Sequence, residues 1–134
     1  MILINNLTTV PIDEKFVKKI VKIVLRGEKK EKGEISIAFV GSERIRELNR
    51  KYRGKNKTTD ILSFGGDGSG ELVICLKQVK KNAKTLKSTF NRELARVLTH
   101  GILHLLGYEH EKSERDKDKM MAKEEYYLSF LSVP

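Results

Sequence analysis

The sequence has one cysteine, no tryptophan and no long hydrophobic run. Cys75 lies in the apolar stretch ELVICL, which is typical of a small buried residue, and a single cysteine excludes a disulfide within the chain. No apolar stretch approaches the roughly 20 residues that cross a bilayer, and the first residues lack the basic and apolar regions of a secretory signal. We therefore expect a cytoplasmic protein with no membrane partner.

Positive charge is abundant: 27 Lys and Arg residues stand against 18 Asp and Glu residues, giving a net charge of +9. Such a balance favours a polyanionic partner such as nucleic acid. Two predicted helices, within 15–26 and 77–87, each carry a row of lysines at helical spacing. A row of this kind can also be an ordinary solvated helix face, so both interpretations remain open.

Hydrophobic spacing and turn residues predict one α+β domain over residues 1–134. We expect a mixed sheet of about four strands packed by about five helices, with no nucleotide cofactor site. Ser42 is predicted to cap the second helix, and Leu86 to face inward at the end of the third. Expected strands are 1–6, 34–41, 61–66 and 70–76; expected helices are 12–27, 43–54, 77–87, 89–106 and 113–131.

All three histidines of the chain lie in one stretch, HGILHLLGYEH at 100–110. On a helical wheel His100 and His104 fall one turn apart at the margin of an apolar face, so they can point at one metal ion. Gly107 suits the left-handed turn that ends a helix, and such a turn would bring His110 back beside them. Three imidazoles with one open position are typical of a catalytic metal centre. The alternative is a set of hydrogen-bonded histidines at a helix end.

Imidazole ligands favour a single divalent metal ion, zinc first, although nickel, copper and iron also fit. The spacing of the histidines is that of metzincin proteases, which have a glutamate base directly after the first histidine. Here that position is Gly101, so the peptidase interpretation lacks its general base. The excess of cations indicates an anionic substrate instead.

Three stretches resemble the YbeY endoribonuclease and rRNA-maturation family over essentially the whole chain. HGILHLLGYEH matches the signature H-G-x-L-H-L-x-G-Y-D-H, with Glu109 in place of the usual aspartate. YRGKNKTTDILSF matches the central segment, with Thr58 in place of a common proline, and GELVICLKQVKKNA matches the strand and helix that follow. The glycine-rich GGDGSG also departs from a family segment that usually begins with proline.

The resemblance implies that His100, His104 and His110 bind the metal and that Arg53 is a functional arginine beside it. It further implies a single-strand-specific endoribonuclease that acts in 16S rRNA maturation and ribosome quality control. A metal-activated water would attack phosphorus while Arg53 stabilises the charge on phosphate oxygens. The alternative is a non-catalytic, ribosome-associated RNA-binding assembly factor in which the metal is structural.

Overall fold

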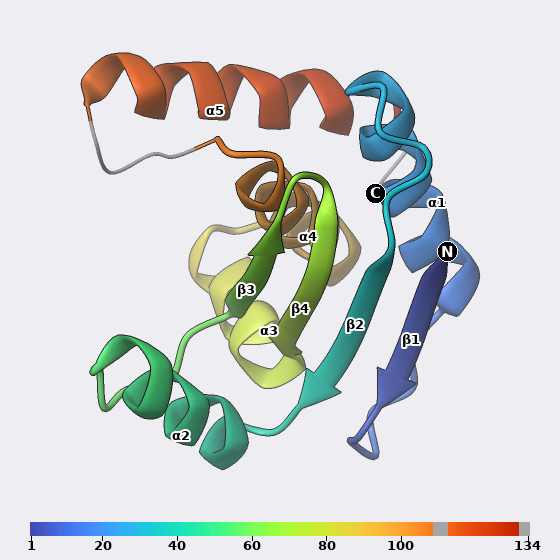
Figure 1. Ribbon diagram of the computed structural model, residues 1–134. Coiled ribbons are helices and arrows are strands. Elements are labelled where there is room, and N and C mark those ends of the chain that lie inside the picture. Colours follow the sequence, from blue (N-terminus) through green and yellow to red (C-terminus); the bar gives the residue numbers. More distant parts are fainter. Residues whose placement is uncertain (109–112, 132–134) are drawn as a thin grey trace.

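A computed structural model of the protein describes residues 1–108 and 113–131. It confirms the α+β class: four strands form one mixed sheet in the order β1-β2-β4-β3, and five helices surround it (Figure 1). Strands β1, β2 and β4 are mutually parallel, and β3 is antiparallel to β4. The strands are β1 (Ile2–Asn6), β2 (Ile35–Val40), β3 (Ile61–Gly66) and β4 (Ser69–Cys75); the helices are α1 (Glu14–Gly27), α2 (Ser42–Arg53), α3 (Leu76–Thr85), α4 (Phe90–Leu105) and α5 (Glu114–Leu128).

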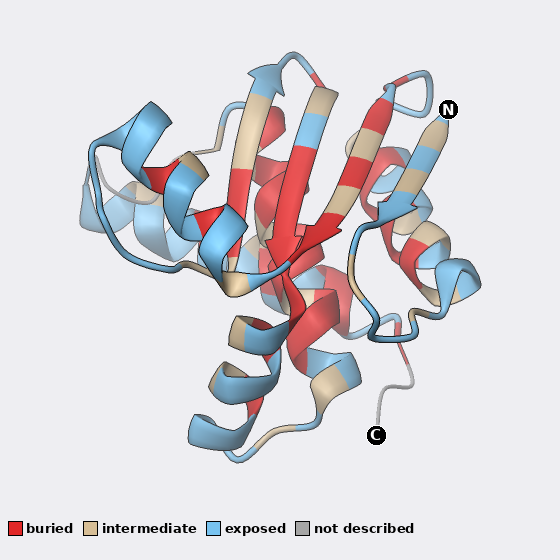
Figure 2. Cartoon of the chain, turned by 90° about the horizontal axis from the view of Figure 1, so that it is seen from below, coloured by how far each residue is buried: buried red, intermediate tan, exposed pale blue. Residues whose placement is uncertain are grey.

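The two faces of the sheet are covered unequally. Alternate residues of β2, such as Ile35, Ile37 and Phe39, are buried in the main core, to which α1, α3, α4 and α5 contribute. The opposite face holds a smaller cluster around Ile45 of α2. Figure 2 shows the buried residues concentrated in the middle strands and in α4. The histidine-bearing helix is thus the central element of the main layer.

The chain between β3 and β4 makes a two-residue turn at Asp67 and Gly68. Both residues have positive φ, 56° and 81°, which is the type I′ geometry that matches the twist of a hairpin. The Gly68 N–H donates to the carbonyl of Leu105 at 2.9 Å. The tip of the hairpin therefore satisfies a carbonyl at the last turn of α4.

Two local predictions are wrong. The N-cap of α2 is Gly41, not Ser42, which is already helical and places its Oγ 3.8 Å from Cys75 Sγ. Leu86 is 59% exposed, because α3 ends at Thr85 and Lys87 then takes a φ of 54° that turns the chain toward α4. None of the helices in residues 1–108 and 113–131 combines the length and the apolar character needed to cross a membrane.

Candidate metal centre

The sequence of α4 sets which of its sides meets the core and which carries the histidines. Thr89 caps the helix by accepting a hydrogen bond from the Arg92 N–H at 3.1 Å. The predicted apolar stripe is buried throughout: Leu94, Val97, Leu98, Gly101, Ile102 and Leu105. His100 and His104 lie at the margin of that stripe and are half-buried.

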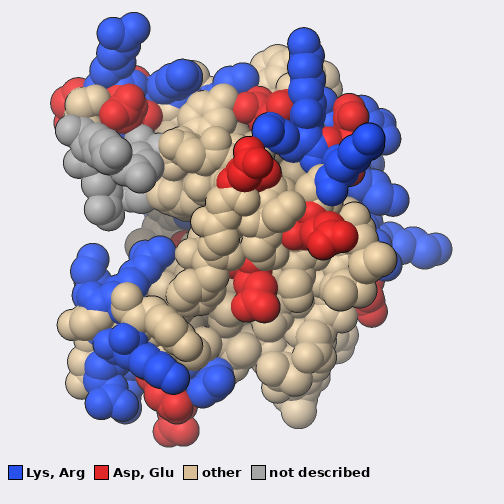
Figure 3. Space-filling model, in the orientation of Figure 1, with Lys and Arg blue, Asp and Glu red and all other residues tan. Residues whose placement is uncertain are grey.

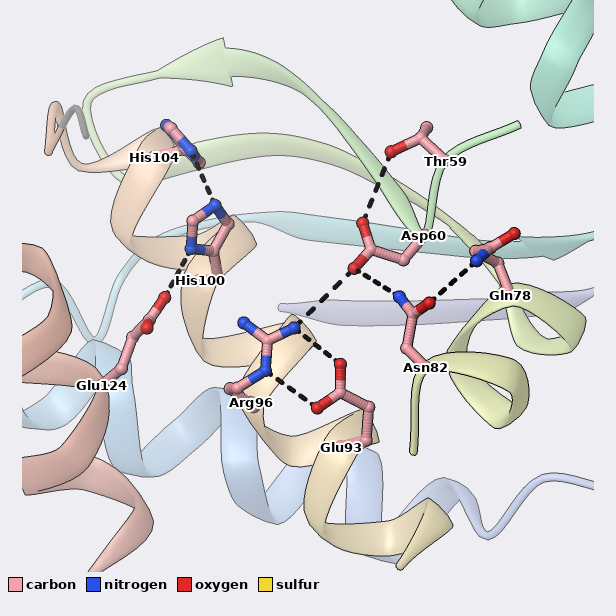
Figure 4. A network of polar contacts seen from close by, with 9 residues as sticks. All are labelled: Thr59, Asp60, Gln78, Asn82, Glu93, Arg96, His100, His104 and Glu124. Atoms are coloured by element: carbon pink, nitrogen blue, oxygen red, sulfur yellow. Dashed lines mark hydrogen bonds and ion pairs between the residues drawn. The ribbon is translucent and has the colours of Figure 1, made fainter. Parts of the chain in front are cut away.

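The structure brings His100 and His104 together. Their Nε2 atoms are 3.0 Å apart and the two rings meet edge to face (Figure 4). Neighbouring imidazoles that present the same nitrogen to a shared point are a suitable pair of metal ligands. Within residues 1–108 and 113–131, no three His, Cys, Asp or Glu side chains are grouped as a metal-binding set. The third predicted ligand, His110, lies outside the described residues, so the set of three stays a prediction.

Glu124, on α5, orients His100. Its Oε1 is in hydrogen-bond contact with His100 Nδ1, and Glu124 itself is buried. When Nδ1 carries the proton that this carboxylate accepts, the lone pair of a neutral imidazole is on Nε2, the atom that faces His104. Carboxylates hold metal-binding histidines in this way. The donor set present therefore fits a divalent metal.

Sequence reasoning missed Glu124, although a signal was available. Met120 and Tyr127 are buried at positions i−4 and i+3 from it, so a carboxylate interrupts the inward face of α5. A buried glutamate on an apolar stripe needs a partner. The apolar spacing of α5 alone could not identify His100 as that partner.

Gly101 allows α4 to lie directly against the sheet. A Cβ at this position would come within 2.5 Å of Ile61 Cδ1 and 2.9 Å of Leu72 Cδ2. A glutamate here would point into packed side chains of β3 and β4 rather than toward a substrate. The structure thus gives a second reason, beyond composition, against a peptidase of the metzincin kind.

The predicted left-handed turn at Gly107 is confirmed, with a φ of 95°. The Gly107 N–H donates to the His104 carbonyl and the Tyr108 N–H donates to the Leu103 carbonyl, both at 3.0 Å, which together form a Schellman motif. The helix therefore ends directly before this turn, as the sequence predicts.

Tyr108 is held in place by Glu28, which follows α1. The Tyr108 hydroxyl donates to Glu28 Oε1 at 2.6 Å, while Lys123 Nζ, at 3.0 Å, and the Tyr127 hydroxyl donate to Oε2. Burial alone would raise the pKa of Glu28, but these hydrogen bonds outweigh it and leave the pKa below the usual value. Burial and the bond to Glu28 raise the pKa of Tyr127. One carboxylate thus joins α1 to the end of α4 and to α5.

Arg96 extends the histidine row by one turn toward the start of α4. Its Nε and Nη2 donate to the two carboxylate oxygens of buried Glu93 at 2.9 and 2.6 Å, and Nη2 lies 3.9 Å from Asp60 Oδ2 (Figure 4). The bond to Glu93 raises the pKa of Arg96, with the charges of Glu124 and Asp60 adding to it. A permanent cation therefore sits beside the candidate site. Sequence reasoning missed it, although positions 96, 100 and 104 share one helix face.

Arg53 is the last residue of α2 and is exposed to solvent. No hydrogen bond or ion pair joins it to the histidine pair in the part of the chain that the structure describes. The chain continues through residues 54–59 to Asp60, and buried Asn49 steadies this loop by donating to the Lys57 carbonyl at 2.9 Å. Figure 3 shows Lys and Arg side chains gathered over α2. The role of Arg53 stays a prediction.

Comparison with known proteins identifies the family. The family model described as endoribonuclease YbeY matches residues 3–132. Proteins named endoribonuclease YbeY include one from Thermodesulfovibrio yellowstonii, 50% identical over 72% of this chain and 66% of its own length, and one from Chlorobium luteolum, 36% identical over 96% of both chains.

A solved structure with the same fold is the solution structure of TM1509 from Thermotoga maritima. It is 30% identical, has a TM-score of 0.71, and the match covers 96% of this chain and 87% of that one. Sequence and fold agree over nearly the whole length, and the chain belongs to the endoribonuclease YbeY family.

Proposed function

We propose that this protein is a metal-dependent endoribonuclease that cleaves single-stranded RNA, in the cytoplasm, during 16S rRNA maturation and ribosome quality control. The observation that carries the proposal is the His100–His104 pair oriented by Glu124, in a chain that belongs to an endoribonuclease family. We propose that His110 completes the ligand set and that zinc is the metal. The ribosomal subunit is the proposed partner.

Each residue of the site would have its own role in phosphodiester hydrolysis. His100 and His104 would hold the metal through Nε2, and Glu124 keeps the His100 proton on Nδ1. When bound, a divalent metal supplies Lewis acidity and lowers the pKa of water, so that hydroxide is available to attack phosphorus near neutral pH. Arg53 would lie against a non-bridging phosphate oxygen, where its forked donors match the charge that develops as the bond to the leaving oxygen breaks.

Metal analysis and RNA cleavage on the same samples test this proposal. Wild-type protein should contain about one metal ion per chain and cleave a single-stranded rRNA fragment. His100→Ala, His104→Ala and His110→Ala should each lose metal and cleavage together, whereas Arg53→Ala should keep the metal and lose cleavage.

Three other outcomes would overturn parts of the proposal. Wild-type protein without stoichiometric metal would refute the metal centre. Cleavage that survives His104→Ala would belong to a contaminating nuclease. Bound metal and tight RNA binding without cleavage would replace the enzyme with a non-catalytic RNA-binding assembly factor.

A further inference from the structure

One side of α1 carries three cations at a spacing of four residues: Lys18, Lys22 and Arg26. Successive members lie about 6 Å apart along the helix axis, a spacing comparable with that of neighbouring phosphates in an extended single strand. No carboxylate of the described residues forms an ion pair with any of the three. Their charge is therefore available to an outside anion.

These cations border a hollow of about 340 Å³ between α1, β1 and the segment that leads into β2. Apolar side chains, Ile2 and Leu25, form part of its lining, together with Gly33. A cationic margin beside an apolar surface is the combination that single-stranded nucleic acid binding uses, with phosphates on the cations and bases against the apolar groups.

Two further hollows follow this one toward the C-terminal end of α4. A second one, of about 320 Å³, shares Glu31 and Gly33 with the first and is lined by Lys30 and Lys32. A third, of about 400 Å³, shares Lys30 with the second and reaches Tyr108 and Lys119. Tyr108 lies four residues after His104. Because neighbouring hollows share lining residues, the three follow one another from the α1 cations to the C-terminal end of α4. Figure 3 shows Lys and Arg side chains gathered over the region of α1 and its connection to β2.

Acidic residues along this course only partly offset the cations. Glu28 is occupied by three donors of its own, and Asp67 pairs with Lys30 at 3.3 Å. Glu31 and Asp116 also line the hollows. Among the residues that the structure describes, the longest row of cations without an ion pair on this course is Lys18, Lys22 and Arg26.

We infer that the basic track, defined as Lys18, Lys22, Arg26, Lys30 and Lys119, binds the sugar-phosphate backbone of RNA that extends beyond the candidate metal centre. This inference rests on the proposed function for the identity of the ligand. The track gives long single strands an advantage over short ones, because only a long strand spans both the histidine pair and α1. A concave course toward the C-terminal end of α4 favours RNA over an anionic membrane, which would meet a flat or convex surface.

The test compares Lys18→Gln/Lys22→Gln/Arg26→Gln with a matched control, Lys77→Gln/Lys80→Gln/Lys84→Gln, which removes the same charge from exposed positions of α3. Fluorescence anisotropy measures the affinity of each protein for single-stranded RNAs of about 6 and about 24 nucleotides over a range of salt. Gels check that the RNA stays intact, and circular dichroism checks folding. Anionic vesicles are titrated in parallel.

The α1 variant should lose about tenfold or more in affinity for the long RNA relative to the short one. The slope of log affinity against log salt should shrink by about 2, since each single-strand phosphate contact contributes about 0.7. The control should match wild type. Three outcomes would each contradict RNA binding by the basic track. These are equal losses of affinity in the two variants, no loss in the α1 variant, and vesicle binding that depends on the α1 cations while RNA binding does not.

Cleavage by wild-type protein keeps the two proposals apart. If wild type cleaves no RNA but the α1 variant loses long-RNA binding, the proposed function fails and the track stands. If wild type cleaves RNA and the α1 variant binds the long RNA as well as the control does, the track fails and the proposed function stands.

Discussion

Two carboxylates of the helical layer, Glu28 at the end of α1 and Glu124 on α5, differ in what they contact. Glu28 accepts hydrogen bonds from two tyrosines and a lysine that lie 80 to 99 residues later in the sequence. Glu124 contacts one imidazole, whose other nitrogen faces the second histidine. The hydrogen bonds of the first arrangement are complete within the protein, whereas the second brings together the two nitrogens that we propose as metal ligands. Glu28 is thus a structural anchor, and Glu124 is a candidate positioning residue for the proposed metal site.

The largest expected effect is on stability, from Glu28→Ala. Loss of this carboxylate leaves two tyrosine hydroxyls and Lys123 without their acceptor, so the free energy of unfolding should fall by about 2 to 4 kcal/mol. Urea denaturation measures it. Exposed Glu125 provides the control, since Glu125→Ala should change stability by less than about 0.5 kcal/mol. A Glu28→Ala protein as stable as wild type would show that Glu28 is not a structural anchor.

The next effect is on metal affinity, from Glu124→Ala. Without the carboxylate, His100 loses the acceptor that orients its ring, and metal affinity should fall about 10- to 100-fold. Competition with a chromogenic chelator measures this. Glu124→Gln should fall less, because the amide oxygen still accepts from Nδ1. If Glu28→Ala lowered metal affinity as much as Glu124→Ala does, at temperatures where both are folded, the two carboxylates would have the same role.

A smaller effect is expected at the start of α5, the helix that meets both carboxylates. Ser113 Oγ accepts from the Asp116 N–H at 3.1 Å, so Ser113→Ala should cost about 1 kcal/mol. Ser42→Ala is the contrasting change, because Ser42 caps nothing and should lose only a few tenths of a kcal/mol. Thermal unfolding of both variants checks the pair, and equal losses would contradict the structure.

The smallest expected effect is a dependence on pH. The pKa of Glu28 in the folded protein lies below the usual 4.5, so its contribution is present above that value and is lost as pH falls through the folded pKa. Wild type should therefore exceed Glu28→Gln in stability by a constant margin near neutral pH. The margin should shrink only in acid below the usual pKa, as urea midpoints at successive pH values would show. A margin that shrinks between pH 8 and 6 would point to another group.

The local features of the candidate site could be predicted from sequence, and its long-range contacts could not. The apolar stripe of α4, the pairing of His100 with His104 and the turn at Gly107 depend on residues within a few positions of each other. The contact of Glu124 with His100 depends on how α5 packs against α4, and that of Glu28 with Tyr108 on the position of α1. Periodicity identifies an inward residue but not the residue that it meets.

The two wrong local predictions have the same origin. Serine is a common N-cap residue, but only Gly41 separates β2 from α2. Gly41 has the extended backbone of an N-cap, and Ser42 is already the first residue of the helix. Leu86 continues the spacing of α3, but the helix stops one residue earlier at Thr85. Helix boundaries are decided by how the connected elements pack, which residue types alone do not specify.

The contact between His100 and Glu124 also orders events during synthesis. Translation makes α4 before α5, so both histidines of the pair are synthesised before the carboxylate that contacts His100 Nδ1. A nascent chain that ends at α4 lacks this carboxylate, so the contact with His100 Nδ1 forms only when α5 packs against α4. Under the proposed function, the packing of α5 against α4, rather than the synthesis of the histidines, would therefore complete this part of the metal site.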